Sequence, residues 1–196
     1  MSAEALRKRD PGVRSRPRRG RALSVTVIIA GLALSVAASA DSLDVPMRDF
    51  GVGPLSGEPS PIVLPDLGGQ PVALGDQRGR VVLLYFWATW CPYCAKEMPT
   101  SLQRLHTAFR DQGLVILAIN LVEPRAQVAA WVQDRGLTFP VLLDETGAVA
   151  SAYRVRATPT VILIDRRGQL LGRTVGSREW DTEGRALIAA LLAARP

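Results

Sequence analysis

A buried-strand pattern that leads directly into a pair of cysteines is the feature that most restricts how this chain can fold. Residues 81–87 (VVLLYFW) form a continuous apolar run rich in β-branched and aromatic side chains, which is typical of a strand covered on both faces. After three intervening residues comes the segment CPYC, residues 91–94. Proline favours the first position of a helix, so the pattern predicts that Cys91 lies where a central strand ends and a helix begins.

The segments that follow alternate between helix and strand. Apolar residues recur with helical spacing over 92–112, Gly113 ends that pattern, and residues 114–120 (LVILAIN) form a second buried strand. Strand, helix and strand of this length form a parallel, right-handed unit. Residues 124–135 predict a second helix with Pro124 at its first position, and residues 139–143 form another short apolar segment.

Two hairpins and a last helix complete the expected fold. Residues 62–64 and 71–73 predict a short hairpin at the start of the domain, and residues 160–164 and 169–175 predict a second hairpin. Residues 180–194 predict a final amphipathic helix. The fold class is therefore α/β, with a central mixed sheet flanked by helices and an N-terminal β-hairpin extension.

Basic residues are concentrated at the N-terminus. Residues 1–40 contain eight basic and two acidic residues, so their net charge of +6 equals that of the whole chain. Residues 41–196 therefore have no net charge. The basic excess that nucleic-acid binding requires does not lie on the domain, and we expect no nucleic-acid partner.

The same N-terminal residues have the order of an export signal. The basic stretch is followed by an uncharged segment, 22–40, which closes with the small residues Ala38-Ser39-Ala40 before Asp41. This site favours cleavage. The segment also approaches the roughly 20 apolar residues that span a bilayer, so an uncleaved membrane anchor is the alternative. In either case the positive flank predicts that the rest of the chain lies in the periplasm or on the extracytoplasmic face of the membrane.

Proline and glycine mark the start of the domain. Residues 41–60 contain three prolines and three glycines, a composition typical of a linker. We therefore expect a linker over 41–60 and one domain over 61–196. With 47% hydrophobic residues, a chain of this length can bury one full-sized core.

The two cysteines are spaced for redox chemistry. They are too few to staple an exported domain, and residues three apart on a helix lie about 5 to 6 Å apart, which is the separation that a disulfide needs. Cys91 would lie against the unpaired amides of the first helical turn, which favour a thiolate, the attacking species. Cys94, one turn deeper, is expected to be the shielded, resolving thiol.

Other uses of the cysteines fit the sequence less well. A structural disulfide or two inert core cysteines remain alternatives. A metal site would need about four ligands, which the two cysteines and the single histidine, His106, cannot supply. Ala95 stands where covalent haem attachment would need histidine. We therefore expect no metal and no cofactor, and we interpret His106 as a surface or packing residue.

Two segments resemble those of a known family. Residues 86–99 (FWATWCPYCAKEMP) resemble the active-site segment of thioredoxin-fold proteins, specifically the exported TlpA-like and ResA-like reductases. Residues 157–160 (ATPT), followed by Ile164-Asp165 and Gly168, resemble the second motif of that family. The resemblance covers residues from about 60 to 196, and it implies a thioredoxin fold and a thiol–disulfide oxidoreductase.

The resemblance also implies roles for individual residues. Pro159 matches the family's cis-proline beside the disulfide, with Thr158 before it, where the substrate backbone would pair. Glu97, three residues after Cys94 on the same helical face, matches the position that handles a proton in these reductases. A solvated first-turn glutamate is the alternative. We expect Glu97→Gln to slow turnover and to change stability little, because the helix position is expected to be partly solvated. Pro99 is expected to kink the helix because it lacks an amide donor.

Two departures from the family pattern affect the expected chemistry. Tyr85 occupies the strand position where thioredoxin has a buried aspartate, so more weight falls on Glu97 as the base. The dipeptide Pro92-Tyr93 resembles that of glutaredoxin, and potentials across such folds span roughly 150 mV. Pro92, Tyr93 and Trp90 are expected to contact the substrate at the rim of the disulfide, whereas Trp87 is expected to be a core residue.

The expected reaction needs no cofactor. The Cys91 thiolate attacks a substrate disulfide, and Cys94 then displaces the reduced substrate. The resemblance implies a membrane thiol electron donor and protein substrates such as apocytochrome c or metal-site assembly proteins. One alternative is a disulfide oxidase or isomerase, and another is a noncatalytic binding or chaperone domain of the same fold. A peroxidase of the related peroxiredoxin group fits less well, because the usual proline and threonine pattern before its cysteine is missing here.

Overall fold

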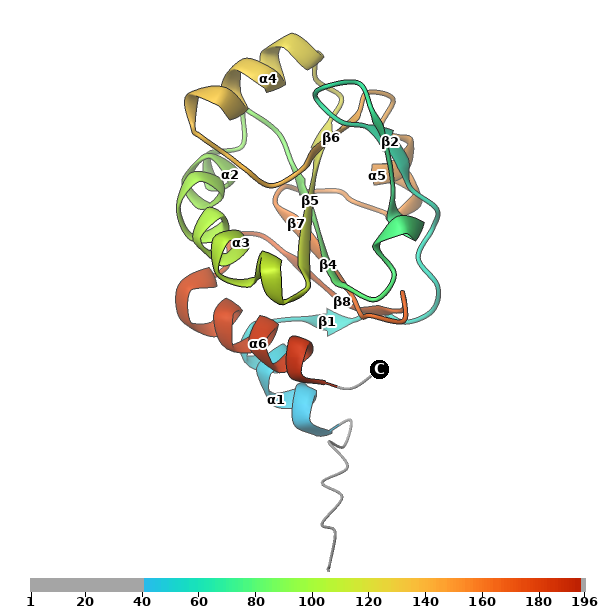
Figure 1. Ribbon diagram of the computed structural model, residues 1–196, viewed down its shortest axis with the longest axis vertical. Helices are drawn as coiled ribbons and strands as arrows, with labels where there is room; N and C mark the ends of the chain where they lie inside the picture. Colours follow the sequence, from blue (N-terminus) through green and yellow to red (C-terminus); the bar gives the residue numbers. More distant parts are fainter. Residues whose placement is uncertain (1–40, 195–196) are drawn as a thin grey trace, which may run out of the picture. The chain divides into compact units, whose positions relative to one another are not determined.

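A six-stranded mixed sheet forms the centre of the protein, whose computed structural model describes residues 41–194 (Figure 1). The strand order is β1-β8-β7-β4-β5-β6. The pairs β4·β5 and β5·β6 are parallel, and the other pairs are antiparallel. The strands are β1 (Gly53–Pro54), β4 (Val81–Trp87), β5 (Leu114–Leu121), β6 (Val141–Asp144), β7 (Thr160–Ile164) and β8 (Leu170–Val175). The predicted α/β fold with a mixed sheet is confirmed.

Strand β4 lies in the middle of the sheet and is buried along its whole length. Successive side chains of a strand point to opposite faces, so β4 contributes to two cores. Val81, Leu83, Tyr85 and Trp87 belong to one apolar cluster, and the three residues between them belong to the other. This double burial explains why the segment is uniformly apolar in the sequence.

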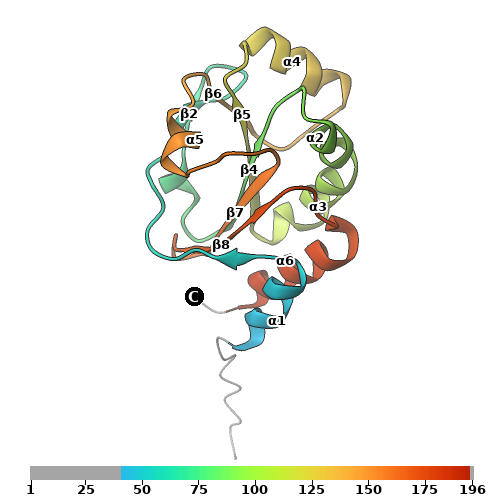
Figure 2. The ribbon, with the colours of Figure 1, turned by 180° about the vertical axis from the view of Figure 1, so that it is seen from behind.

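Helices cover the two faces of the sheet unequally (Figures 1 and 2). The first face is covered by α1 (Asp41–Asp49), α2 (Pro92–Glu97), α3 (Gln103–Phe109), α4 (Arg125–Asp134) and α6 (Arg185–Ala193). The second face is covered by α5 (Ala148–Ala152), the 3-10 turn η1 (Leu74–Gln77) and the hairpin of β2 (Val63–Pro65) and β3 (Pro71–Ala73). The two cysteines pack in the cluster of the first face.

The predicted helix over 92–112 is divided into shorter pieces. A π-helical turn over Met98–Leu102 separates α2 from α3, and a 3-10 turn over Arg110–Gln112 precedes the left-handed Gly113. Pro99 lies inside the π turn, where its missing amide interrupts the regular hydrogen bonds. A second π turn, Trp180–Gly184, begins the last helical segment.

The prediction of a linker over 41–60 is wrong for its first part. Residues 41–49 form α1, which packs against α6, and β1 pairs with β8 as the edge strand of the sheet. Leu43, Met47 and Phe50 are spaced three or four residues apart and face the first core. This short apolar stripe stabilises a helix despite the surrounding prolines and glycines. The domain therefore begins by residue 41.

The predicted export signal or anchor, residues 1–40, lies outside the described residues. Among residues 41–194, no helix is both long enough and apolar enough to cross a membrane.

Candidate active site

Cys91 lies at the boundary between strand and helix that the sequence predicts. Its backbone is extended, with φ −79° and ψ 113°, and it forms the N-cap of α2, with Pro92 at the first helical position. The amide of Cys94 donates a hydrogen bond of 3.2 Å to the Cys91 sulfur. A donor of this kind favours negative charge on the sulfur, so the local backbone suits Cys91 to be the thiolate.

The two cysteines form a disulfide whose Cα atoms are 5.3 Å apart. In this oxidised state Cys91 is 2% exposed and Cys94 is completely buried. The side chains of Trp90 and Tyr93, in contrast, are 70% and 56% exposed. The disulfide is therefore nearly covered, and two large aromatic side chains close to Cys91 in the sequence are exposed to solvent.

Glu97, on the last turn of α2, is buried and accepts hydrogen bonds from four groups. The Tyr85 phenol and the Trp180 indole N–H donate to Oε2 over 2.9 Å and 3.1 Å. The backbone amide of Arg178 donates to Oε1 over 2.9 Å, and the Ser177 hydroxyl donates to the same oxygen. Four donors from two parts of the chain, β4 and residues 177–180, therefore hold the carboxylate in one orientation.

This environment overturns the interpretation of Glu97 as a solvated helix residue, because the residue is only 4% exposed. Tyr85 also has a role that its apolar strand did not reveal. Burial and the adjacent Glu97 carboxylate raise the pKa of Tyr85 far above its ordinary value, so the phenol stays protonated and donates. The partners Ser177, Arg178 and Trp180 lie about 80 residues away in sequence, and no local pattern links them to Glu97.

The structure brings Pro159 to the same edge of the sheet as the cysteines. Strand β7 begins at Thr160, which pairs with Phe86 near the end of β4, so the start of β7 lies beside the turn that carries Cys91. The peptide bond between Thr158 and Pro159 is cis. The Pro159 carbonyl accepts the amide of Gly176 at 2.8 Å, which ties this turn to the end of β8.

A second buried carboxylate, Glu123, was missed in the sequence. Its side chain is 7% exposed and accepts the Thr89 amide at 2.7 Å, together with the Thr89 hydroxyl. Asn120 and Gln127 donate to it as well, over 2.7 Å and 2.9 Å. Glu123 therefore fastens the turn that precedes Trp90 to the loop after β5. The only sequence signal is Asn120, a polar residue inside an otherwise apolar strand.

His106 is a packing residue. It is 7% exposed, and its ring meets the ring of Phe139 edge-on, with the centroids 5.8 Å apart. Burial, and then the nearby Arg110 charge, lower its pKa. Trp87 is likewise a core residue, completely buried against Trp131. No group of three potential metal ligands occurs within the described part of the chain.

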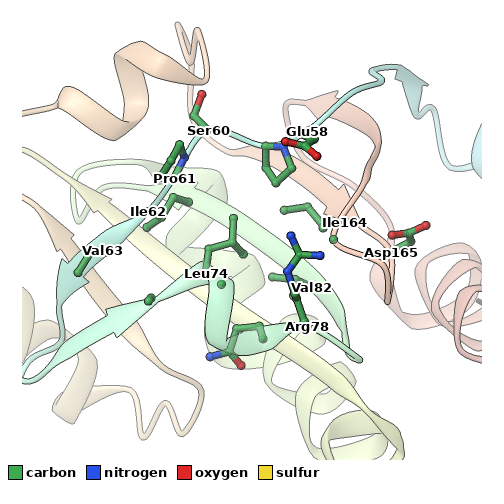
Figure 3. A pocket seen from close by; sticks show the side chains of 15 residues that line it. Glu58, Ser60, Pro61, Ile62, Val63, Leu74, Arg78, Val82, Ile164 and Asp165 are labelled. Atoms are coloured by element: carbon green, nitrogen blue, oxygen red, sulfur yellow. The ribbon is translucent and has the colours of Figure 1, made fainter.

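A cavity of about 390 Å³ lies away from the cysteines (Figure 3). Ile62, Leu74, Val82 and Ile164 line it, and all four belong to the apolar cluster of the second face. The side chain of Arg78 extends along this cavity. Because the disulfide packs in the cluster of the opposite face, the cavity is separate from the candidate site.

Comparison with known proteins agrees with this geometry. The AhpC/TSA family model matches residues 59–172. The chain is 43% identical over 108 residues to the thiol-disulfide oxidoreductase ResA of Geobacillus kaustophilus (strain HTA426), a match that covers 55% of this chain and 62% of that protein. It is 36% identical over 115 residues to ResA of Bacillus subtilis (strain 168), covering 59% and 64%. The match thus spans less than two thirds of either relative.

Solved structures show the same fold. A putative thiol:disulfide interchange protein DsbE from Chlorobium tepidum has a TM-score of 0.66 and 30% identity, covering 72% of this chain and all of that one. A putative thioredoxin from Neisseria meningitidis has a TM-score of 0.61 and 31% identity, covering 67% and 88%. The expected thioredoxin fold is confirmed.

Proposed function

The chain belongs to the AhpC/TSA family, and on that premise we propose that it is a thiol–disulfide oxidoreductase that reduces disulfides in protein substrates. The observation that carries the proposal is the hydrogen bond from the Cys94 amide to the Cys91 sulfur at the start of α2. It selects Cys91 as the nucleophile and leaves the fully buried Cys94 as the resolving thiol.

The reaction transfers two electrons in two exchange steps. The Cys91 thiolate attacks one sulfur of the substrate disulfide; a mixed disulfide forms, and the other substrate sulfur leaves as a thiolate that takes up a proton. Cys94 then loses its proton and attacks the Cys91 sulfur. The mixed disulfide breaks, the substrate leaves with two thiols, and the protein retains the Cys91–Cys94 disulfide.

Glu97 is proposed to assist the second step. It lies one helical turn after Cys94, it is buried, and its carboxylate is held in place by four donors. A shielded thiol must lose a proton before it can resolve the mixed disulfide, and Glu97 carries the only acidic side chain in residues 81–110. General-base assistance of this kind is typically worth about 10² to 10⁴ in rate.

The residues proposed to bind the substrate are those that the resemblance to the thioredoxin-fold reductases implies. Trp90, Pro92 and Tyr93 on one side, and Thr158 and Pro159 on the other, would hold an extended substrate segment across the disulfide. We infer a protein substrate such as apocytochrome c or a metal-site assembly protein, a membrane thiol as electron donor, and an extracytoplasmic location directed by residues 1–40.

The decisive measurement is the reduction potential of the purified protein equilibrated with glutathione. A reductant should have a potential below roughly −220 mV, whereas a value near −120 mV would make the protein a disulfide oxidant. A Cys94→Ser variant should trap a mixed disulfide with a disulfide-containing peptide, and Cys91→Ser should trap none. Unchanged activity in cells that carry the double Cys91→Ser, Cys94→Ser variant would instead show a noncatalytic binding domain.

A further inference from the structure

Val122, at the end of β5, has a backbone conformation that valine rarely adopts. Its φ is 52°, in the left-handed region, where a β-branched side chain is crowded against its own backbone. Within residues 41–194, the only other non-glycine residue with positive φ is Arg154, whose side chain is unbranched at Cβ. Glycine would occupy the same conformation without strain.

The neighbours of Val122 impose this conformation. Its amide donates to the Asp144 carbonyl over 3.1 Å, which ties it to the end of β6. The next residue, Glu123, turns its buried carboxylate towards Thr89 and Asn120. Leu121 pairs with Asp144 of β6, and Glu123 is bonded to Thr89, so both neighbours of Val122 are held in place. Val122 therefore cannot relax without disturbing the turn that precedes Trp90.

Burial of the Val122 side chain does not compensate for its strained backbone conformation. The side chain of Val122 is 62% exposed, and valine contributes to stability mainly when its methyl groups are buried. Strained residues of this kind concentrate at functional sites. A strained and exposed valine is therefore a candidate for contact with something outside the chain.

Val122 lies at the edge of the sheet that carries the disulfide. Strands β4 and β5 are parallel, with Trp87 opposite Asn120, so the loops that follow them emerge side by side (Figure 1). The Thr89–Glu123 hydrogen bonds join those two loops directly. The residue before Cys91, Trp90, therefore stands next to a loop that displays the valine.

Exposed apolar side chains are concentrated at this edge. Within the described chain, six large apolar residues are exposed, and four of them surround the disulfide edge: Trp90, Tyr93, Val122 and Val175. Val175 pairs with Thr160, directly after Pro159, so it lies on the opposite side of the cysteines from β5. Single exposed apolar residues are common, but a group of four around one reactive site marks a contact surface.

We propose that Val122 is a specificity-determining residue, which contacts an apolar side chain next to the cysteine of an extended polypeptide substrate. The inference rests on the proposed function. The exposed side chains at this edge are aromatic and aliphatic, which selects an apolar partner side chain by chemistry. The chemistry of exchange is unchanged, because Val122 supplies binding surface and touches neither sulfur of the protein's disulfide.

The test compares three disulfides as substrates of the reduced protein. Two are synthetic peptides with one intramolecular Cys-Ala-Ala-Cys disulfide, preceded by leucine in one and by serine in the other. The third is glutathione disulfide. The variants are Val122→Ala and Val122→Gly, with Val63→Ala as the matched control, because Val63 is 66% exposed but lies in the hairpin on the second face.

Both Val122 variants should lower kcat/KM for the leucine peptide by about five- to ten-fold, since two buried methyl groups are lost. Rates with the serine peptide and with glutathione disulfide should stay within about two-fold, and Val63→Ala should change none of the three. Val122→Gly should melt roughly 2 to 4 °C above Val122→Ala, because only glycine relieves the left-handed backbone.

Two results would overturn the role of Val122. One is an unchanged rate of the variants with the leucine peptide. The other is an equal loss with all three disulfides, which would mean that the substitution disturbs the cysteines themselves. Failure of the unsubstituted protein to reduce any of the three would count against the proposed function instead, so the two failures are distinguishable.

Discussion

The phenol of Tyr85 donates a hydrogen bond of 2.9 Å to the carboxylate of Glu97, and both side chains are buried. The first residue lies on the central strand β4 and the second on α2, which contains Cys94 and has Cys91 as its N-cap. This bond links the middle of the sheet to the helix that carries both cysteines. In the sequence, Tyr85 was notable only because it stands where thioredoxin has an acid. In the structure, it holds the carboxylate of Glu97 on the adjacent helix in place.

Tyr85→Phe should make the protein less stable by about 1 to 3 kcal/mol near pH 8, because it leaves a buried carboxylate oxygen short of a donor. This difference in unfolding free energy between the two proteins should become smaller above about pH 10. Burial, and then Glu97, raise the folded pKa of Tyr85, whereas the unfolded phenol ionises near pH 10. The stability that Tyr85 contributes is therefore full below pH 10 and is lost as the pH rises further.

Urea unfolding of both proteins at pH 8 and pH 11 measures this difference. Tyr153, whose pKa burial raises to about 12, contributes equally to both proteins and cancels. A difference in unfolding free energy that is the same at the two pH values would contradict the assignment.

Glu97→Gln should slow thiol–disulfide exchange near neutral pH by roughly 10² to 10⁴ if Glu97 is the base. The substitution should also lower the free energy of unfolding by about 1 to 3 kcal/mol. The new side-chain NH2 group would face hydrogen-bond donors at a position where a carboxylate oxygen accepted their bonds. The small stability change that the sequence predicted for Glu97→Gln therefore no longer holds, because Glu97 is buried. Lys96→Gln, one residue earlier and exposed, is the control. Exchange rates that superimpose over the whole pH range would remove Glu97 from the mechanism.

His106 should titrate below its usual pKa of about 6.5, because burial and the Arg110 charge disfavour the protonated ring. The unfolded chain then binds the proton more tightly than the folded chain. His106 therefore leaves stability unchanged above pH 6.5 and lowers it as the pH falls below that value. The chain has a single histidine, so one NMR resonance reports the midpoint directly. A midpoint at or above 6.5 would contradict the burial argument.

Iodoacetamide should label Cys91 well before Cys94 in the reduced protein at neutral pH. The Cys94 amide donates to the Cys91 sulfur and favours its thiolate, and Cys91 caps the helix whereas Cys94 lies one turn inside it. Mass spectrometry of peptides after short labelling times gives the two rates. The same protein in urea, where both thiols are exposed, should label evenly. Equal labelling rates of the two cysteines in the folded protein would contradict their proposed roles.

Local sequence patterns were sufficient to predict the elements that carry the cysteines. The expected strands over 81–87 and 160–164 have the same bounds as β4 and β7, because each is a continuous buried run with a distinct beginning and end. The position of Cys91 at a helix start follows from Pro92 in the same way. These features depend on residues close together in the chain.

The surroundings of those elements were decided only by the tertiary structure. Glu97 is buried because Ser177, Arg178 and Trp180 come to it from about 80 residues away, and Glu123 is buried because it meets Thr89 across two loops. A sequence pattern reports the preference of each residue for its own segment, whereas hydrogen-bond partners and burial depend on which segments meet in space. The sequence therefore determined where the disulfide pair lies, and the packing of distant segments determined which carboxylates are buried around it.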